Sequence, residues 1–87
     1  MPLRRLIAAA CSEKKSLKIR YSNAYGDVTN RVVDILGMGT NYFDAFDHLR
    51  NEQRTFRVDR VIKAEWTDDT FRQTPHYSPS QWVTIRR

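Results

Sequence analysis

Residues 42–61 read YFDAFDHLRNEQRTFRVDRV, and this stretch contains two β-like runs on either side of a polar turn. The first run, 42–47, is rich in aromatic residues and leads into the turn at 49–52, as expected of a strand that enters a hairpin. Residues 53–57 supply the antiparallel partner of that strand. The stretch therefore predicts a β-hairpin within a mainly β fold.

The residues after this hairpin continue the β pattern. Residues 58–60 resemble a short corner, and 61–66 have the composition of a strand with either Val61 or Ile62 turned inward. The C-terminal extension, 67–87, is rich in turn-forming residues and ends in a short apolar alternation. We expect it to add an edge strand, to dock against the domain, or to lead into a further segment.

Two more strands are predicted upstream of the hairpin. From Ser16 onward, apolar residues recur at every second position, as a half-buried strand requires: Leu17, Ile19 and Tyr21. After a turn at 23–27, a second alternating run covers 28–35 and places Arg31 among apolar neighbours. The glycines in 37–39 then break the pattern.

A short helix precedes the strands. Pro2 suits a first helical turn, and apolar residues fall at helical spacing over 2–14: Leu3, Leu6, Ile7 and Ala10. One helix followed by five short strands predicts a small barrel with an N-terminal α-helix. Because 87 residues suffice for only one compact core, we expect a single domain over 1–87 with its barrel at 16–66.

Composition argues against several classes of protein. The single Cys11 cannot form an internal disulfide, and with His48 and His76 far apart in the sequence we expect no metal site. The apolar run 6–11 is too short for a secretory signal, and no stretch approaches the roughly 18 apolar residues of a membrane span. No activated nucleophile or glycine-rich phosphate loop is evident. We therefore expect no membrane association, no enzymatic activity, no cofactor and a cytoplasmic location.

Positive charge is concentrated in one part of the chain. The formal net charge is +5 at pH 7. Within 50–63, only Glu52 and Asp59 oppose five cationic residues: Arg50, Arg54, Arg57, Arg60 and Lys63. The planar fork of arginine donates two parallel hydrogen bonds to a phosphate, which makes such a cluster suited to anionic ligands. Unpaired bases also need aromatic rings to stack on, and three tyrosines are candidates: Tyr21, Tyr25 and Tyr42.

The hairpin quoted above resembles the WYL domain, in which a hairpin and an arginine-spaced stretch follow a defining tripeptide. Here the tripeptide position is 41–43, and the arginine pattern RTFRVDR occupies 54–60. Two upstream strand segments, 19–21 and 29–33, also resemble the family, and the resemblance spans about 6–66. It implies an Sm-like, SH3-like barrel of the kind found in bacterial transcription regulators and sometimes attached to helicases.

In that family a basic groove of the barrel receives nucleotides or single-stranded nucleic acid. Position by position, the resemblance assigns seven residues to the groove: Tyr21, Arg31, Tyr42, His48, Arg54, Arg57 and Arg60. The residues and the resemblance together predict an accessory or regulatory binding module. Its expected partners are single-stranded DNA or a nucleotide-like anionic ligand and a neighbouring domain in a larger bacterial protein.

The alternative is a protein-interaction or dimerisation module of a bacterial transcription regulator. In that case an edge strand and the apolar tail dock a partner, such as a second copy of the chain. The arginines then form structural ion pairs with carboxylates nearby in the sequence: Asp44, Asp47 and Asp59. The two hypotheses differ in whether the arginines are free to meet a ligand.

Overall fold

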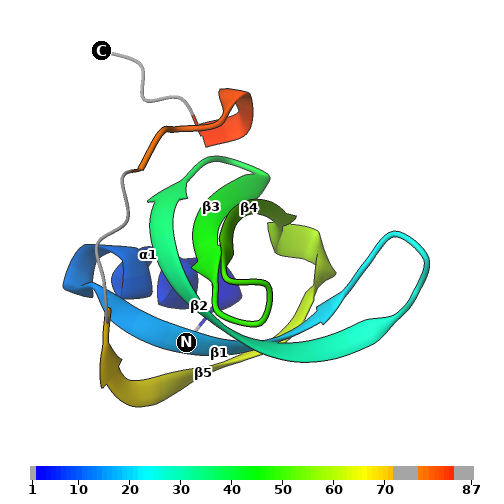
Figure 1. The fold of residues 1–87 in the computed structure, drawn as a ribbon, viewed down its shortest axis with the longest axis horizontal. Coiled ribbons are helices and arrows are strands. Elements are labelled where there is room, and N and C mark those ends of the chain that lie inside the picture. The colour runs from blue at the N-terminus through cyan, green and yellow to red at the C-terminus, as the bar shows by residue number, and fades with distance from the viewer. Residues whose placement is uncertain (1, 72–76, 84–87) are drawn as a thin grey trace.

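The computed structural model describes residues 2–71 and 77–83 (Figure 1). Its elements in chain order are α1 (Leu3–Glu13), β1 (Lys15–Ser22), β2 (Val28–Met38), β3 (Tyr42–Asp47), β4 (Glu52–Arg57), the 3-10 turn η1 (Val58–Arg60), β5 (Val61–Thr70) and the 3-10 turn η2 (Gln81–Val83). The predicted mainly β class with an N-terminal helix is confirmed.

The five strands form one antiparallel sheet in the order β4-β3-β2-β1-β5. The long strands β1 and β2 bend strongly, so that the sheet curls around its contents (Figure 1). Irregularities of register accompany this bending, one in the β2–β3 pair between Ile35 and Gly37 and two in the β1–β5 pair, between Lys15 and Leu17 and between Arg20 and Tyr21. The curled sheet is compatible with an Sm-like or SH3-like barrel, but strand pairing does not close it, and β4 and β5 are its edges.

The core fills the inside of the curled sheet. Phe43 and Phe56, which face each other across the β3–β4 pair, stack with ring centres 5.4 Å apart. Ile7 and Ala10 of α1 are fully buried in the same cluster. On β5, Val61 is 7% exposed and Ile62 is 56% exposed, so Val61 is the residue that turns inward. Apolar residues at alternate strand positions therefore account for most of the core, as the sequence pattern predicted.

The fifth strand is longer than expected, because β5 continues past Trp66 to Thr70. The last residues of β5 are held against the start of β1. Lys15 pairs with Thr70 in the sheet, and Thr67 donates a hydrogen bond of 2.8 Å from its hydroxyl to the carbonyl of Ser16. These contacts extend the sheet beyond the barrel segment predicted at 16–66.

Residues 77–83 of the C-terminal extension dock against the sheet. Its anchor is the fully buried carboxylate of Asp44, which accepts hydrogen bonds of 2.9 Å from the Tyr77 hydroxyl and from the Ser80 backbone N–H. Trp82 stacks on Tyr42 with ring centres 4.6 Å apart. Of the three possibilities considered for the extension, residues 77–83 therefore follow the second and dock against the domain. The predicted alternation through Ile85, together with His76, lies outside the described residues.

Burial alone would raise the pKa of Asp44, but hydrogen bonds from Ser80, Thr55 and Tyr77 outweigh it and leave the pKa below its usual range. Because the folded-state pKa is depressed, the stabilisation is present above about pH 4 and is lost as the pH falls through the folded value. We expect acid to detach 77–83 from the sheet. Trp82 fluorescence, recorded between neutral and strongly acid pH in a Trp66→Phe variant, measures this step.

The matched control is Asp44→Asn in the same background. Asparagine does not ionise in this range, so this variant should lack the acid transition. A transition of equal size and midpoint in both proteins would contradict a role for Asp44 in the docking.

Candidate functional site

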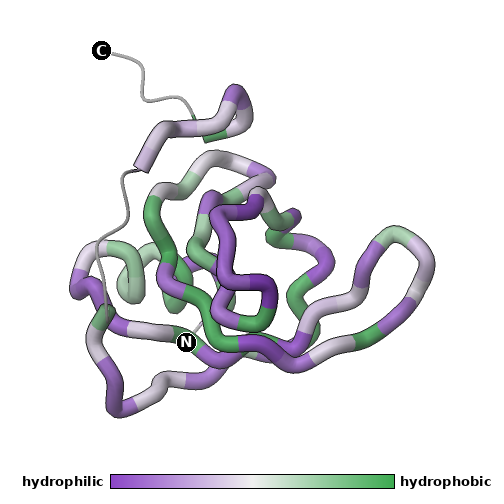
Figure 2. Tube along the Cα trace, in the orientation of Figure 1, coloured by the Kyte–Doolittle hydropathy of each residue, from purple (hydrophilic) through white to green (hydrophobic). Residues whose placement is uncertain are grey.

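An open cleft of about 340 Å³ lies between the β1–β2 hairpin and the β3–β4 hairpin. Among the described residues, its lining includes four arginines and no aspartate or glutamate. The arginines come from β2, the β3–β4 turn, β4 and η1, in that order: Arg31, Arg50, Arg54 and Arg60. Six other residues complete the wall: Tyr21, Asn23, Ala24, Tyr25, Thr55 and Phe56. We call this feature the arginine cleft. Hydrophilic residues also predominate along β4 and the β3–β4 turn (Figure 2).

Arg31 forms the inner wall of the arginine cleft. Its side chain is only 8% exposed, and its Nη1 lies 2.5 Å from Oδ2 of Asp47, whose side chain is fully buried. Nη2 donates a hydrogen bond of 2.7 Å to the hydroxyl of Thr29. Asp47 also accepts a hydrogen bond of 3.0 Å from the Leu49 N–H through its second carboxylate oxygen. One buried carboxylate therefore ties Arg31 to the turn that carries Arg50.

The other arginines of the cleft are more accessible. Arg54 is 41% exposed and lies 4.0 Å from Glu52, a distance at which a solvated pair contributes little. Within 2–71 and 77–83, Arg50 and Arg60 form no ion pair or hydrogen bond through their side chains. The cleft thus combines one neutralised guanidinium on its inner wall with charge that remains free to meet an anion.

Two tyrosines line the arginine cleft in different ways. Tyr21 is 8% exposed, packs edge-on against Phe56, and accepts a hydrogen bond of 2.9 Å from the Arg57 N–H through its hydroxyl. It is therefore mainly a core residue. Tyr25, in the β1–β2 turn, is 91% exposed. Asn23 shapes that turn, since its side-chain oxygen accepts hydrogen bonds of 2.8 Å and 3.0 Å from the N–H groups of Tyr25 and Asp27.

Arg57 and Tyr42 lie in a different hollow, of about 170 Å³, which Arg4 and Asp59 also line. The Arg57 guanidinium donates hydrogen bonds of 2.9 Å and 2.7 Å to the two carboxylate oxygens of Asp59. This bidentate contact raises the pKa of Arg57 and lowers the pKa of Asp59. The corner η1 follows Arg57 directly and carries Arg60 to the arginine cleft, which is why the two arginines do not share one surface.

His48 lies outside both hollows. Its Nε2 is 3.0 Å from Oδ2 of Asp34, a carboxylate that is 1% exposed and accepts a hydrogen bond of 2.6 Å from the Ser16 hydroxyl. The ring also packs edge-on against Phe46. The structure therefore places His48, a partly exposed residue, next to the buried Asp34 rather than beside the arginines.

Of the seven residues that the sequence suggested, the structure gathers four in the arginine cleft: Tyr21, Arg31, Arg54 and Arg60. It adds Arg50, which belonged to the charge cluster in the sequence but was not among the residues that the resemblance assigned to the groove. It also adds Tyr25, a stacking candidate in the sequence, together with Asn23 and Thr55. The clustering of charge in the sequence could have indicated Arg50 as a site residue, whereas no sequence feature indicated Thr55.

The described residues also lack two kinds of feature. Among them, no group of three histidine, cysteine or acidic side chains is arranged to hold a metal ion. No helix in the same residues is long and apolar enough to cross a membrane.

The chain is similar to known proteins in sequence and in structure. The sequence model of the WYL domain matches residues 2–66. Among solved structures, the chain resembles proteasome accessory factor B/C (PafBC) of Arthrobacter aurescens, with 32% sequence identity and a TM-score of 0.72. That match covers 79% of this chain but only 12% of the PafBC chain, so the chain spans a small part of that protein. No curated protein matches the chain.

The buried pair Arg31–Asp47 leads to a prediction about the stability of the fold. Asp47→Ala leaves a buried guanidinium without its partner, so the free energy of unfolding should fall by about 3–5 kcal/mol. Urea denaturation measures the change. The double variant Arg31→Met/Asp47→Leu removes both charges and should cost less than Asp47→Ala alone.

Asp59→Ala is the surface control, because Asp59 pairs with Arg57 in solvent and its loss should change stability little. Equal effects of Asp47→Ala and Asp59→Ala would contradict the importance of the buried pair.

Proposed function

The chain belongs to the WYL domain family, and we propose that it is a non-catalytic regulatory module that binds a phosphate-bearing ligand in the arginine cleft. The observation that carries this proposal is the lining of the cleft, where arginines from four separate elements converge and which, among the described residues, includes no aspartate or glutamate. An ordinary solvated surface mixes both signs of charge. A concave surface of one sign raises the local concentration of ligands of the other sign.

The ligand that this surface fits best is single-stranded DNA or a nucleotide-like anion. The guanidinium groups of Arg50 and Arg60, which form no ion pair with the described residues, can each donate two parallel hydrogen bonds to phosphate oxygens. Tyr25, almost fully exposed at the rim, offers a ring on which an unpaired base can stack. A volume of about 340 Å³ lies at the lower end of the range for small-ligand sites.

We propose that the domain binds its ligand as one part of a larger protein. The match to PafBC covers 12% of that chain, so a domain of this kind forms part of a longer polypeptide there. We place the present domain in a similar setting, next to a neighbouring domain that responds when the cleft is occupied. A cytoplasmic location follows from this proposal, because nucleic acid and nucleotides are found there.

One observation favours a second function, that of a protein-interaction module. β4 is an edge of the sheet, and its first four residues, 52–55, are exposed. An exposed edge presents unpaired backbone groups to which another strand can add. On this alternative the chain associates with a partner or with a second copy, and the association does not depend on Arg54 or Arg60.

Titration of a labelled single-stranded oligonucleotide, followed by fluorescence anisotropy at about 50 and about 200 mM salt, tests the first function. Each phosphate contact adds about 0.7 to the slope of log affinity against log salt concentration. Arg54→Ala/Arg60→Ala should therefore lower this slope by about 1.4, besides weakening the binding.

Arg57→Ala is the control, because Asp59 already occupies that guanidinium and it lines the other hollow. It should change the slope less than the double variant does. Equal changes would contradict the arginine cleft as the site. Absence of binding by the wild-type chain, combined with sedimentation as a dimer, would favour the interaction module instead.

A further inference from the structure

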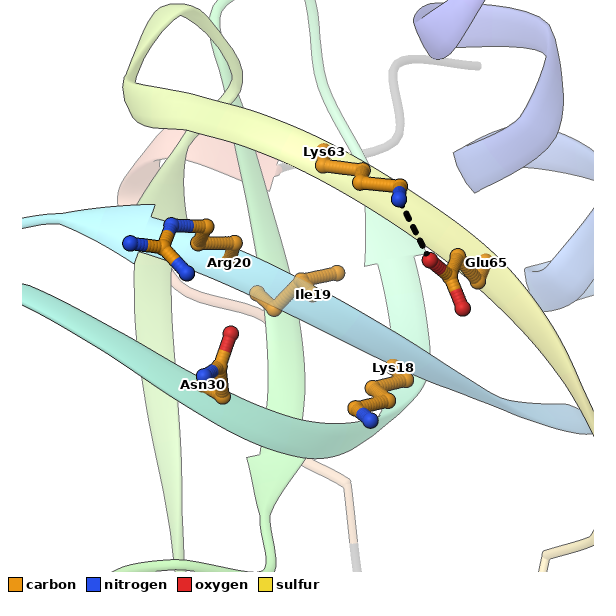
Figure 3. A pocket seen from close by; sticks show the side chains of 6 residues that line it. All are labelled: Lys18, Ile19, Arg20, Asn30, Lys63 and Glu65. Atoms are coloured by element: carbon orange, nitrogen blue, oxygen red, sulfur yellow. Dashed lines mark ion pairs between the residues drawn. The ribbon is translucent and has the colours of Figure 1, made fainter.

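A second basic hollow lies on β1, β2 and β5. It has a volume of about 140 Å³ and is lined by Lys18, Ile19, Arg20, Asn30, Lys63 and Glu65 (Figure 3). Lys18 and Arg20 are exposed and alternate along β1 with the buried residues Ile19 and Tyr21. Because alternate residues of a strand point to opposite faces, this hollow faces away from the core and away from the arginine cleft, which Tyr21 lines.

The charge of this outer hollow is not balanced. Three cations share it with one carboxylate, Glu65, to which Lys63 binds at 2.8 Å. Figure 3 shows the Lys63 amine turned toward Glu65, while the Arg20 guanidinium extends in the other direction. Arg20 forms no ion pair with any residue in 2–71 or 77–83. One guanidinium is therefore left available to a ligand.

The sheet register places Arg20 in an unfavourable position. Arg20 lies directly opposite Lys63 in the antiparallel β1–β5 pair. Like charges that face each other across a pair of strands destabilise the sheet. Glu65 pairs with Lys63, so Arg20 is left with no carboxylate partner among the described residues, and an anion bound beside Arg20 would supply one.

We infer that this outer face is a second anion-binding surface, which contacts the sugar–phosphate backbone of a nucleic acid strand. Among the described residues no aromatic ring lines the hollow, so it offers no platform for bases. Arg20 and Lys18 are two residues apart on one strand, or about 6.6 Å, which is comparable to the spacing of successive phosphates in an extended strand. Contacts of this type position a nucleic acid without reading its sequence.

This inference does not rest on the function proposed for the arginine cleft, and a probe without bases tests it separately. The probe is a fluorescently labelled abasic phosphodiester oligomer, titrated at several salt concentrations with the full chain carrying Arg54→Ala/Arg60→Ala. In that background, Arg20→Ala should lower the slope of log affinity against log salt concentration by about 0.7.

Arg5→Ala is the matched control, because Arg5 is an exposed arginine on α1 and its loss changes the net charge equally. It should leave the slope at the value of the background variant. An equal loss in both variants would show only a dependence on net charge and would overturn the inference. An unchanged slope in Arg20→Ala would overturn it as well.

Thermal unfolding separates a binding role for Arg20 from a structural one. Removal of a charge opposite Lys63 should leave the unfolding midpoint of Arg20→Ala unchanged or raise it. A lowered midpoint would assign Arg20 to the fold and overturn the inference. Equal affinity for a polyglutamate peptide, lost in the same variant, would overturn the assignment of the surface to phosphate.

Discussion

The architecture of the arginine cleft depends on the need to pair a buried charge. Arg31 lies on the inner face of β2, where a guanidinium is tolerated only with a partner. Asp47 supplies that partner and uses its second oxygen to hold the Leu49 N–H in the β3–β4 turn. The inner wall of the cleft and the turn at its rim are thereby fixed to each other through one carboxylate.

The strand β3 carries two fully buried aspartates with different tasks. Asp47 faces Arg31 and the turn, whereas Asp44 binds Thr55, Tyr77 and Ser80 and holds the C-terminal extension to the sheet. A buried carboxylate is costly unless its oxygens accept several hydrogen bonds, and both residues meet this requirement. Neither is available to neutralise Arg50 or Arg60, so the cleft keeps its positive charge.

Local sequence patterns predicted most of the elements. Alternation of apolar residues identified β1 and β2, and the aromatic run of β3 followed by a polar turn identified the hairpin with β4. These features depend on side chains only a few residues apart, which is why one sequence was sufficient. The length of β5 was not predicted, because its last residues are held by contacts to Lys15 and Ser16, more than fifty residues earlier in the chain.

For the candidate site, the sequence by itself determined the number of arginines, their clustering around the hairpin, and the position of Arg31 among apolar residues of a strand. Tertiary structure decided which of them meet. The corner η1 sends Arg60 to the cleft and leaves Arg57 with Asp59, while Asp34 draws His48 into a separate cluster. The Arg57–Asp59 pair is local in the sequence, whereas the carboxylate partners of Arg31 and His48 lie on neighbouring strands and are fixed only by the register and curling of the sheet.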